Sequence, residues 1–327
     1  YPTKPRHFDA ARWEGQDLTG KQLLVWPEQG VGDILRFSSI IPELENSGGI
    51  ITIECPPKLI ELYTDTFPWA TVRCVGDDEC RGDENYTYFD YELPMASLGK
   101  YFRQNMDILR ERQRPWIKRY PKAEACVRNQ ILNVEQRKNP DHLVVGVCWG
   151  SSISTQGRDI QMLQAELLGL FSDIENVSWL NVMYSGTTEQ IREIRKDYLP
   201  FYHCTNINQK DDLVGAAAIL GACDIVISVG VSVADFAAGL GVPLIYLAWL
   251  SSAQKDDYKP AAWLPNHKAY YIRTKSKAKT IERIKNDWDE IVKWARETNS
   301  KLIRPEIEQD CLASEEYEFE VDIQTLK

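Results

Sequence analysis

A glycine-rich turn near the start of the chain carries the first side chain with clear chemical potential. Asp33 follows Gly30 and Gly32 in the sequence Glu-Gln-Gly-Val-Gly-Asp. The turn lies between apolar runs at 22–26 and 34–44, whose patterns predict a strand and a helix. A strand, a glycine turn and a helix form the usual ligand-binding corner of an open α/β sheet. Because a carboxylate would repel an anion there, Asp33 is interpreted as a base or a hydroxyl-binding group, although such turns also serve as plain connectors.

A second glycine turn, at Gly230, follows the apolar run 224–229 and opens a helix of small residues. The N–H groups of Val231, Ser232 and Val233 would be free at the start of that helix, where a phosphate binds well. The alternative is structural. Small residues let a helix pack closely on a sheet, and Ser232 would then only cap it.

A phosphate site also needs a cation, and Arg158 is the candidate. It lies in the polar loop after the apolar run 142–149, where Gly150 and Ser151 add further donors. An arginine matches a phosphate through paired N–H donors, although a lone arginine in a polar loop is often simply solvated. In an acidic chain, one focused positive site is consistent with a nucleotide diphosphate ligand.

The composition limits the class of protein. The 327 residues include 38 Lys and Arg against 48 Asp and Glu, and the net charge of −10 argues against a nucleic-acid surface spread over the whole protein. No apolar run reaches the length of a membrane-spanning helix, and the N-terminus has no signal-peptide pattern. The chain starts at Tyr1 without Met, which we interpret as a piece of a longer protein.

The eight cysteines show no Cys-x-x-Cys pair and no neighbouring histidine at metal spacing, so we expect no metal site. Cys148 and Cys223 lie in strongly apolar runs, where buried reduced thiols are expected. This cysteine usage favours the cytoplasm.

Strand-like and helix-like segments alternate along most of the chain, which predicts α/β domains with parallel sheets and right-handed crossovers. The alternation restarts after Asn139-Pro140. We therefore predict a first domain at 1–139, a second at 140–277, and a C-terminal helix with an acidic tail at 278–327. The main helices are expected at 33–46, 163–173, 187–197, 211–220, 232–240 and 278–297.

Several motifs, in order from about residue 11 to residue 297, resemble bacterial glycosyltransferase-like domains related to the heptosyltransferases, glycosyltransferase family nine. Such domains often follow tetratricopeptide repeats, which would then precede Tyr1. The motifs are Arg12-Trp-Glu-Gly15, Glu28-Gln-Gly-Val-Gly-Asp33, Phe89-Asp90, Val145-Gly-Val-Cys-Trp-Gly-Ser151, Asp224-Ile-Val-Ile-Ser-Val229 and Ala237-Ala-Gly-Leu-Gly-Val-Pro243.

The resemblance implies a GT-B architecture, in which two Rossmann-like domains face each other across a cleft and the C-terminal helix returns to the first domain. It implies an inverting, metal-independent transfer from a nucleotide sugar, with no cofactor and with Asp33 as the general base. The implied donor-binding residues are Trp149, Gly150, Ser151, Arg158, Tyr184, Gly230, Val231, Ser232, Val233 and Asp235. The implied acceptor-side residues are Glu28, Gln29, Gly30, Gly32, Arg36 and Glu92.

Three positions depart from the pattern of these relatives. They usually carry an aspartate where this chain has Gly230, a histidine where it has Asp235, and often a histidine where it has Glu92. Two main hypotheses follow. The chain is either a glycosyltransferase acting on a glycan or protein hydroxyl, or a GT-B binding or scaffolding module that no longer uses a donor. A nucleotide-sugar epimerase or hydrolase is a third.

Overall fold

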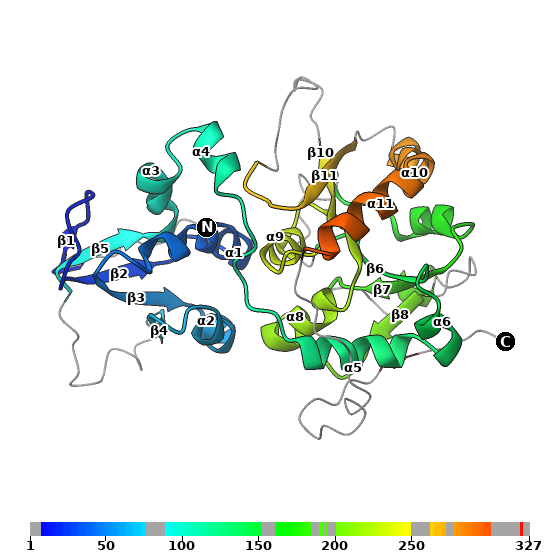
Figure 1. Cartoon of the computed structure of the whole chain (residues 1–327), viewed down its shortest axis with the longest axis horizontal. Helices are drawn as coiled ribbons and strands as arrows, with labels where there is room; N and C mark the ends of the chain where they lie inside the picture. Colours follow the sequence, from blue (N-terminus) through cyan, green and yellow to red (C-terminus); the bar gives the residue numbers. More distant parts are fainter. Residues whose placement is uncertain are drawn as a thin grey trace. The chain divides into compact units, whose positions relative to one another are not determined.

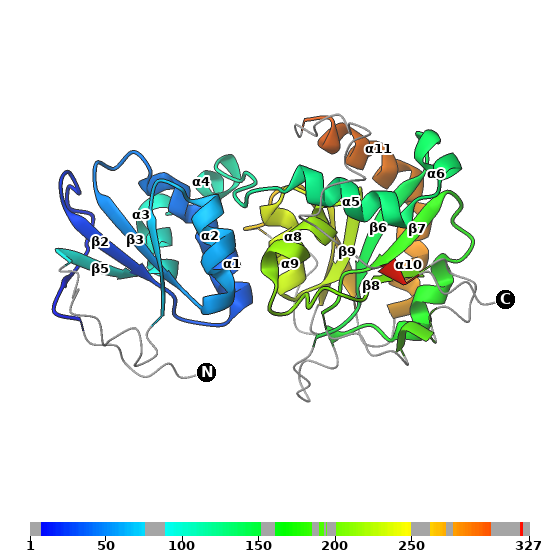
Figure 2. The same ribbon diagram turned by 90° about the horizontal axis from the view of Figure 1, so that it is seen from below.

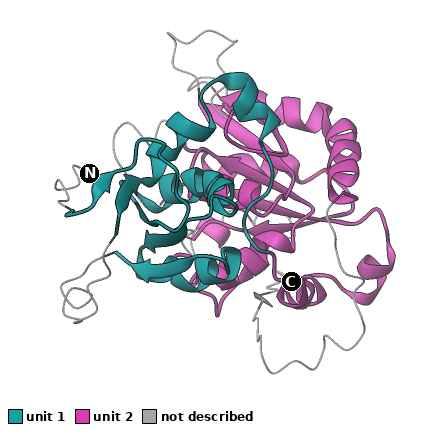
Figure 3. Ribbon diagram, turned by 60° about the vertical axis from the view of Figure 1, so that its left-hand side comes forward, with its two compact units in different colours: residues 1–118 teal, residues 119–327 magenta. Residues whose placement is uncertain are grey.

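The chain forms two compact units, Tyr1–Lys118 and Arg119–Lys327, coloured separately in Figure 3. The computed structural model describes residues 8–75, 89–151, 161–184, 190–192, 194, 201–249, 262–272, 277–301 and 321–322. Each unit is an α/β domain with its own sheet, as the alternation of segments predicted.

The boundary between the units differs from the expected one between residues 139 and 140. The helix α5 (Pro121–Ile131) packs on α8 (Leu213–Gly221) and so belongs to the second unit. Arg119 donates a hydrogen bond from Nη2 to the Gly221 carbonyl at 2.6 Å, which fixes the start of this segment to α8. The charged, helix-prone sequence gave no sign of this long-range contact.

The first unit is built on a five-stranded parallel sheet in the order β1-β5-β2-β3-β4 (Figure 1). Its central strands β2 and β3 are buried along most of their length, and most of their residues are apolar. The chain order reverses between β2 and β5, so their carboxyl ends form the topological switch point of this sheet. The strands are β1 (Ala11–Arg12), β2 (Gln22–Trp26), β3 (Ile50–Cys55), β4 (Thr71–Cys74) and β5 (Tyr91–Pro94).

Short helices connect these strands. The expected helix at 33–46 is divided into an α-helix and a 3₁₀-helix that contains Pro42, because proline cannot donate the hydrogen bond of an α-helix interior. The helices are α1 (Val31–Phe37), η1 (Ser38–Leu44), η2 (Pro57–Leu59), α2 (Ile60–Thr66), η4 (Met95–Leu98), α3 (Gly99–Phe102) and α4 (Met106–Glu111).

The second unit contains a seven-stranded sheet in the order β11-β10-β9-β6-β7-β8-β12. All pairs are parallel except β12 with β8. Counted along the chain, the six parallel strands follow the order 3-2-1-4-5-6 of a doubly wound Rossmann sheet, with its switch point between β6 and β9. The strands are β6 (Leu143–Cys148), β7 (Val177–Asn181), β8 (Phe201–Cys204), β9 (Ile225–Val229), β10 (Leu244–Trp249), β11 (His267–Ile272) and β12 (Val321–Asp322).

Helices pack on this sheet from both sides (Figure 2). The helix α8 begins where the Asp212 carboxylate accepts a hydrogen bond from the Gly215 N–H at 2.7 Å and so caps the helix. The remaining helices are α6 (Val134–Lys138), η6 (Ala165–Phe171), α9 (Ser232–Gly239), α10 (Lys277–Asn286) and α11 (Trp288–Asn299). Most of the helix expected at 187–197 lies outside the described residues.

The C-terminal helices α10 and α11 replace the single helix expected at 278–297. The ring of Trp288 lies 6.0 Å from that of Trp179 on β7, and the Asn299 side chain donates to the Asp224 carbonyl at 3.1 Å. These contacts pack α11 on the second unit, where Ile291 and Ala295 of its apolar face are buried.

Candidate functional site

The first glycine turn lies at the switch point of the first sheet. Trp26 and Pro94 are register partners at the carboxyl ends of β2 and β5, so the segments that follow them are neighbours. The Ala96 N–H donates to Glu28 Oε2 at 3.2 Å, which connects the two segments directly. The sequence predicted the turn itself, but only the order of the strands shows that residues 95–96 complete the corner.

Asp33 lies in the first turn of α1, where its N–H donates to the Gly30 carbonyl at 2.9 Å. Its half-buried side chain lines a small hollow with room for about one water molecule. The floor of the hollow is apolar. Among the described residues that line it, Glu28 and Asp33 carry the charged groups. The hollow is lined by Pro27, Glu28, Gln29, Asp33, Ile34, Phe37, Met95 and Ala96.

Glu28 is the second carboxylate of this hollow. Partial burial raises its pKa above the ordinary value, while the Ala96 N–H and the positive charge of Arg12 lower it to a smaller extent. A carboxylate that is partly desolvated holds a proton more readily than one in water. The corner therefore places two half-buried carboxylates beside one apolar floor.

The other residues implied for the acceptor side near this turn differ in their exposure to solvent. Gln29 and Gly30 are exposed and Gly32 is half-buried, which leaves the turn open to a ligand. Arg36 is half-buried in the last turn of α1 and has an interaction partner.

Glu92 has a structural environment that the sequence did not reveal. It is 5% exposed, and its Oε1 accepts a hydrogen bond from Arg12 Nε at 2.7 Å. Its Oε2 accepts another from the indole of Trp26. Both oxygens are thus held by the neighbouring strands β1 and β2, so Glu92 ties the sheet together and is not open to an acceptor.

The second glycine turn lies at the switch point of the second sheet. Cys148 on β6 and Ser228 on β9 are register partners, so the loops that begin at Trp149 and at Gly230 leave the sheet side by side. The structure therefore brings together the two loops that the sequence analysis assigned to the donor. Arg158 lies outside the described residues.

The helix α9 begins at this edge. Val231 is its N-cap in an extended conformation with no side-chain cap, so Ser232 opens the helix and does not cap it. Exposed Gly230 and half-buried Val231 and Ser232 leave the helix start accessible, whereas Val233 is buried at 6% exposure. Asp235 is 2% exposed and has an interaction partner, so a ligand would reach it only if its neighbours moved.

Tyr246 was not found by sequence analysis, yet it lies beside the missing side chain of Gly230. A Cβ at position 230 would stand 2.8 Å from the Tyr246 hydroxyl oxygen. Tyr246 is paired with Ser228 across β9 and β10, a neighbourhood that no local sequence signal gives. Gly230, where the relatives usually carry an aspartate, thus leaves space for the phenol of Tyr246.

Aromatic residues complete this edge. Trp149 is 1% exposed, and within the described part of the chain its indole N–H has no hydrogen-bond partner. Tyr184 is half-buried and follows β7, the next strand, while the Met183 sulfur would lie 3.2 Å from a Cβ at Gly150. Ser151 is half-buried and has a partner.

Neither a metal-binding cluster nor a membrane-spanning helix is present among the described residues. No group of three or more His, Cys, Asp or Glu side chains there could hold a metal ion. None of the described helices is long and apolar enough to cross a membrane.

Among curated proteins, this chain is similar to protein FlbA of Caulobacter vibrioides, with 25% identity over 276 residues. The match covers 79% of this chain and 44% of FlbA, so the chain spans less than half the length of that relative. The sequence matches no protein-family profile.

Two solved structures show the fold. A glycosyl transferase family 9 protein from Veillonella parvula superposes with a TM-score of 0.56 and 13% identity, covering 88% of this chain and 99% of that chain. The E. coli ADP-heptose LPS heptosyltransferase II superposes with a TM-score of 0.50 and 14% identity, covering 82% and 99%. The chain has the GT-B fold of the heptosyltransferases, as the sequence resemblance implied.

Proposed function

We propose that this chain is a glycosyltransferase that moves a sugar from a nucleotide-sugar donor to a hydroxyl group of a glycan or protein. One observation carries the proposal: each of the two sheets has an accessible glycine turn at its switch point, where open α/β sheets bind ligands. The GT-B fold supports the reaction class by analogy only, since fold alone does not fix function.

In this proposal the first corner takes the acceptor. Asp33 removes the proton from the acceptor hydroxyl while that oxygen attacks the anomeric carbon of the donor sugar. The bond between the anomeric carbon and the phosphate oxygen breaks, and the nucleotide diphosphate leaves with the electron pair. Glu28 and the exposed Gln29 would bind further hydroxyls, and the apolar floor would take a face of the acceptor.

The second corner takes the donor. The N–H groups at the start of α9 and the Ser232 hydroxyl would bind the diphosphate, because a helix N-terminus favours an anion. The loop from Trp149 to Ser151, together with Tyr184 and Arg158, would complete the site. The proposed reaction uses no metal ion and no cofactor, as the resemblance to the heptosyltransferases implies.

A second candidate is a GT-B module that binds a partner without catalysis. Three observations favour it. Gly230 offers no side chain, Asp235 is buried, and Glu92 is held by Arg12 and Trp26. This candidate predicts that no nucleotide diphosphate binds at the second corner.

A donor panel separates the two candidates. UDP-, GDP-, ADP-, TDP- and CMP-sugars are tested for binding by calorimetry and for transfer or hydrolysis by product analysis. Binding of none of them would exclude the transferase. For a donor that is used, Asp33→Asn should lower kcat by about 10²- to 10⁴-fold with an unchanged donor Kd. Asp107→Asn, at an exposed helix start in the same unit, is the matched control. Full activity of Asp33→Asn would refute the base assignment.

The setting of the reaction is part of the proposal. We place it in the cytoplasm, because the described cysteines are all free thiols, most of them buried. We also propose that tetratricopeptide repeats precede this chain in the full-length protein, which mass spectrometry of the native protein would test.

A further inference from the structure

A polar pocket lies at the amino edge of the second sheet, opposite the edge that carries Gly230. It has a volume of about 400 Å³ and is lined from α5, α6, the start of β6 and the end of α11. Cavities of this size hold small metabolites in other proteins. Nothing in the proposed transfer reaction uses this pocket.

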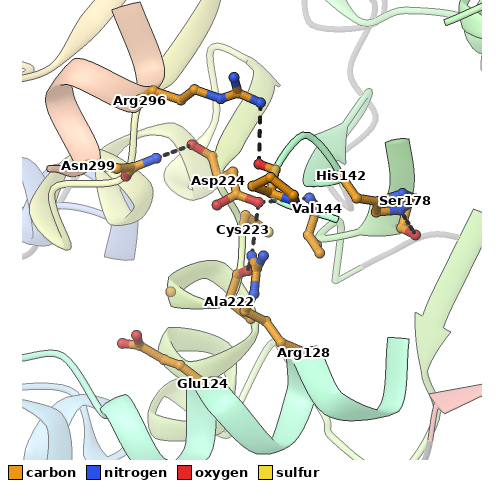
Figure 4. A network of polar contacts seen from close by, with 12 residues as sticks. Glu124, Arg128, His142, Val144, Ser178, Ala222, Cys223, Asp224, Arg296 and Asn299 are labelled. Atoms are coloured by element: carbon orange, nitrogen blue, oxygen red, sulfur yellow. Dashed lines mark hydrogen bonds and ion pairs between the residues drawn. The ribbon is translucent and has the colours of Figure 1, made fainter. Parts of the chain in front are cut away.

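Three arginines line the pocket, and part of each is already engaged. Figure 4 shows two of them, Arg128 and Arg296, with their partners. Arg128 donates from Nη1 to Asp224 Oδ2 at 2.9 Å and to the Ala222 carbonyl at 2.7 Å. Arg296 donates from Nη2 to Asp141 Oδ1 at 2.8 Å. These contacts hold the end of α11 and the middle of α5 against the start of the sheet.

The third arginine, Arg137, has one weak contact, from Nη1 to Asn129 Oδ1 at 3.2 Å. A guanidinium carries five N–H donors, and the protein contacts of Arg128, Arg137 and Arg296 use one nitrogen of each. The remaining nitrogens have no protein partner within the described residues. Arg137 and Arg296 are exposed to solvent and Arg128 is half-buried, so these donors are open to a ligand that displaces water.

The charges favour an anion. Two carboxylates, Asp224 and Asp141, balance two of the three guanidinium groups, which leaves an excess positive charge in a chain whose net charge is −10. Carbonyl groups at helix ends also attract cations, and the Arg128 contact with Ala222 is of that kind. Arg137 lies in the last turn of α6, where the same effect favours a cation, but its side chain bonds to no carbonyl group of a helix end and contacts only the Asn129 amide.

We propose that this pocket binds a small metabolite through an oxyanion, a phosphate or carboxylate group, held by Arg137 and the unused nitrogens of Arg128 and Arg296. Half-buried His142 and the amides of Asn139 and Gln136 line the same pocket and would bind the rest of the molecule. The site is independent of the donor corner and does not depend on the proposed transferase activity.

The test uses the whole chain, titrated with inorganic phosphate and separately with succinate at constant ionic strength. The readout is the NMR signal of the His142 ring, assigned with His142→Gln. The expected result is a saturable shift that Arg137→Gln weakens about ten-fold or more, as the loss of a charge-assisted hydrogen bond implies. Lys138→Gln removes the same charge from the next residue of α6, which does not line the pocket, and should leave the affinity unchanged.

A response to phosphate, to succinate or to both supports the proposal and identifies the oxyanion. The proposal is overturned if neither probe gives a saturable shift at His142. It is equally overturned if Arg137→Gln and Lys138→Gln weaken binding alike, since that result would reflect diffuse charge. An anion held at the donor corner is insensitive to both substitutions and cannot imitate the expected difference.

Discussion

Gly230 and Tyr246 should be coupled energetically, and a double-mutant cycle measures the coupling. In Gly230→Ala the new methyl group would lie 2.8 Å from the Tyr246 hydroxyl oxygen, whereas ordinary van der Waals contact begins at 3.4 Å. Tyr246 is 9% exposed on a strand inside the sheet, so the phenol has little freedom to move away. Overpacking of this kind costs about 1–3 kcal/mol.

A cost of about 2 kcal/mol would lower the Tm of a unit of this size by roughly 4–8 °C. Tyr246→Phe alone should cost no more than about 1 kcal/mol, the typical net contribution of one hydrogen bond. In the double variant the methyl group fits where the hydroxyl was, so its cost should fall below the sum of the two single costs by about 1 kcal/mol or more.

Urea unfolding followed by circular dichroism measures the free energy of unfolding for all four proteins, with thermal scans as a second readout. Tyr270→Phe, on the neighbouring strand β11, is the control for loss of a phenol elsewhere in the sheet. A cost of Gly230→Ala that Tyr246→Phe leaves unchanged would refute the steric argument. It would show that Gly230 is required for a reason other than the phenol.

Three further outcomes follow from the second unit. Gly146→Ala should lower the free energy of unfolding by about 1–3 kcal/mol, because the new Cβ on the central strand β6 would lie 2.8 Å from the Cys223 sulfur. An unchanged midpoint in urea unfolding would contradict this packing. Arg119→Leu should cost about 3–5 kcal/mol by the same measurement, since it leaves the buried carboxylate of Glu124 without its ion pair; Glu124→Gln in that background should recover part of the loss. Burial, and then the charge of Arg128, lower the pKa of His142 below its ordinary 6.5. The folded state therefore disfavours the protonated ring, and stability falls as pH drops through 6.5 towards the lower folded pKa. His142→Gln should lose less stability than the wild type between about pH 7.5 and about pH 5, and equal losses would contradict the assignment.

The sequence by itself determined the local features of the chain. Apolar runs predicted the buried strands β6 and β9, because parallel strands covered on both faces have few polar positions. Glycine turns marked the corners at the switch points of both sheets, and the motifs predicted the GT-B fold that the solved structures confirm. Apolar runs, glycine turns and motifs each depend on residues that are close in the chain, so they can be predicted from the sequence alone.

Only the tertiary structure decided which of these features meet. The order of strands brings residues 95–96 to Glu28, and Tyr246 to Gly230, across pairings that no local pattern specifies. It also removes Glu92 from the acceptor side, because Arg12 and Trp26 on neighbouring strands hold both of its oxygens. A side chain's availability depends on partners far away in sequence, whereas a turn or a strand depends mainly on the residues that form it.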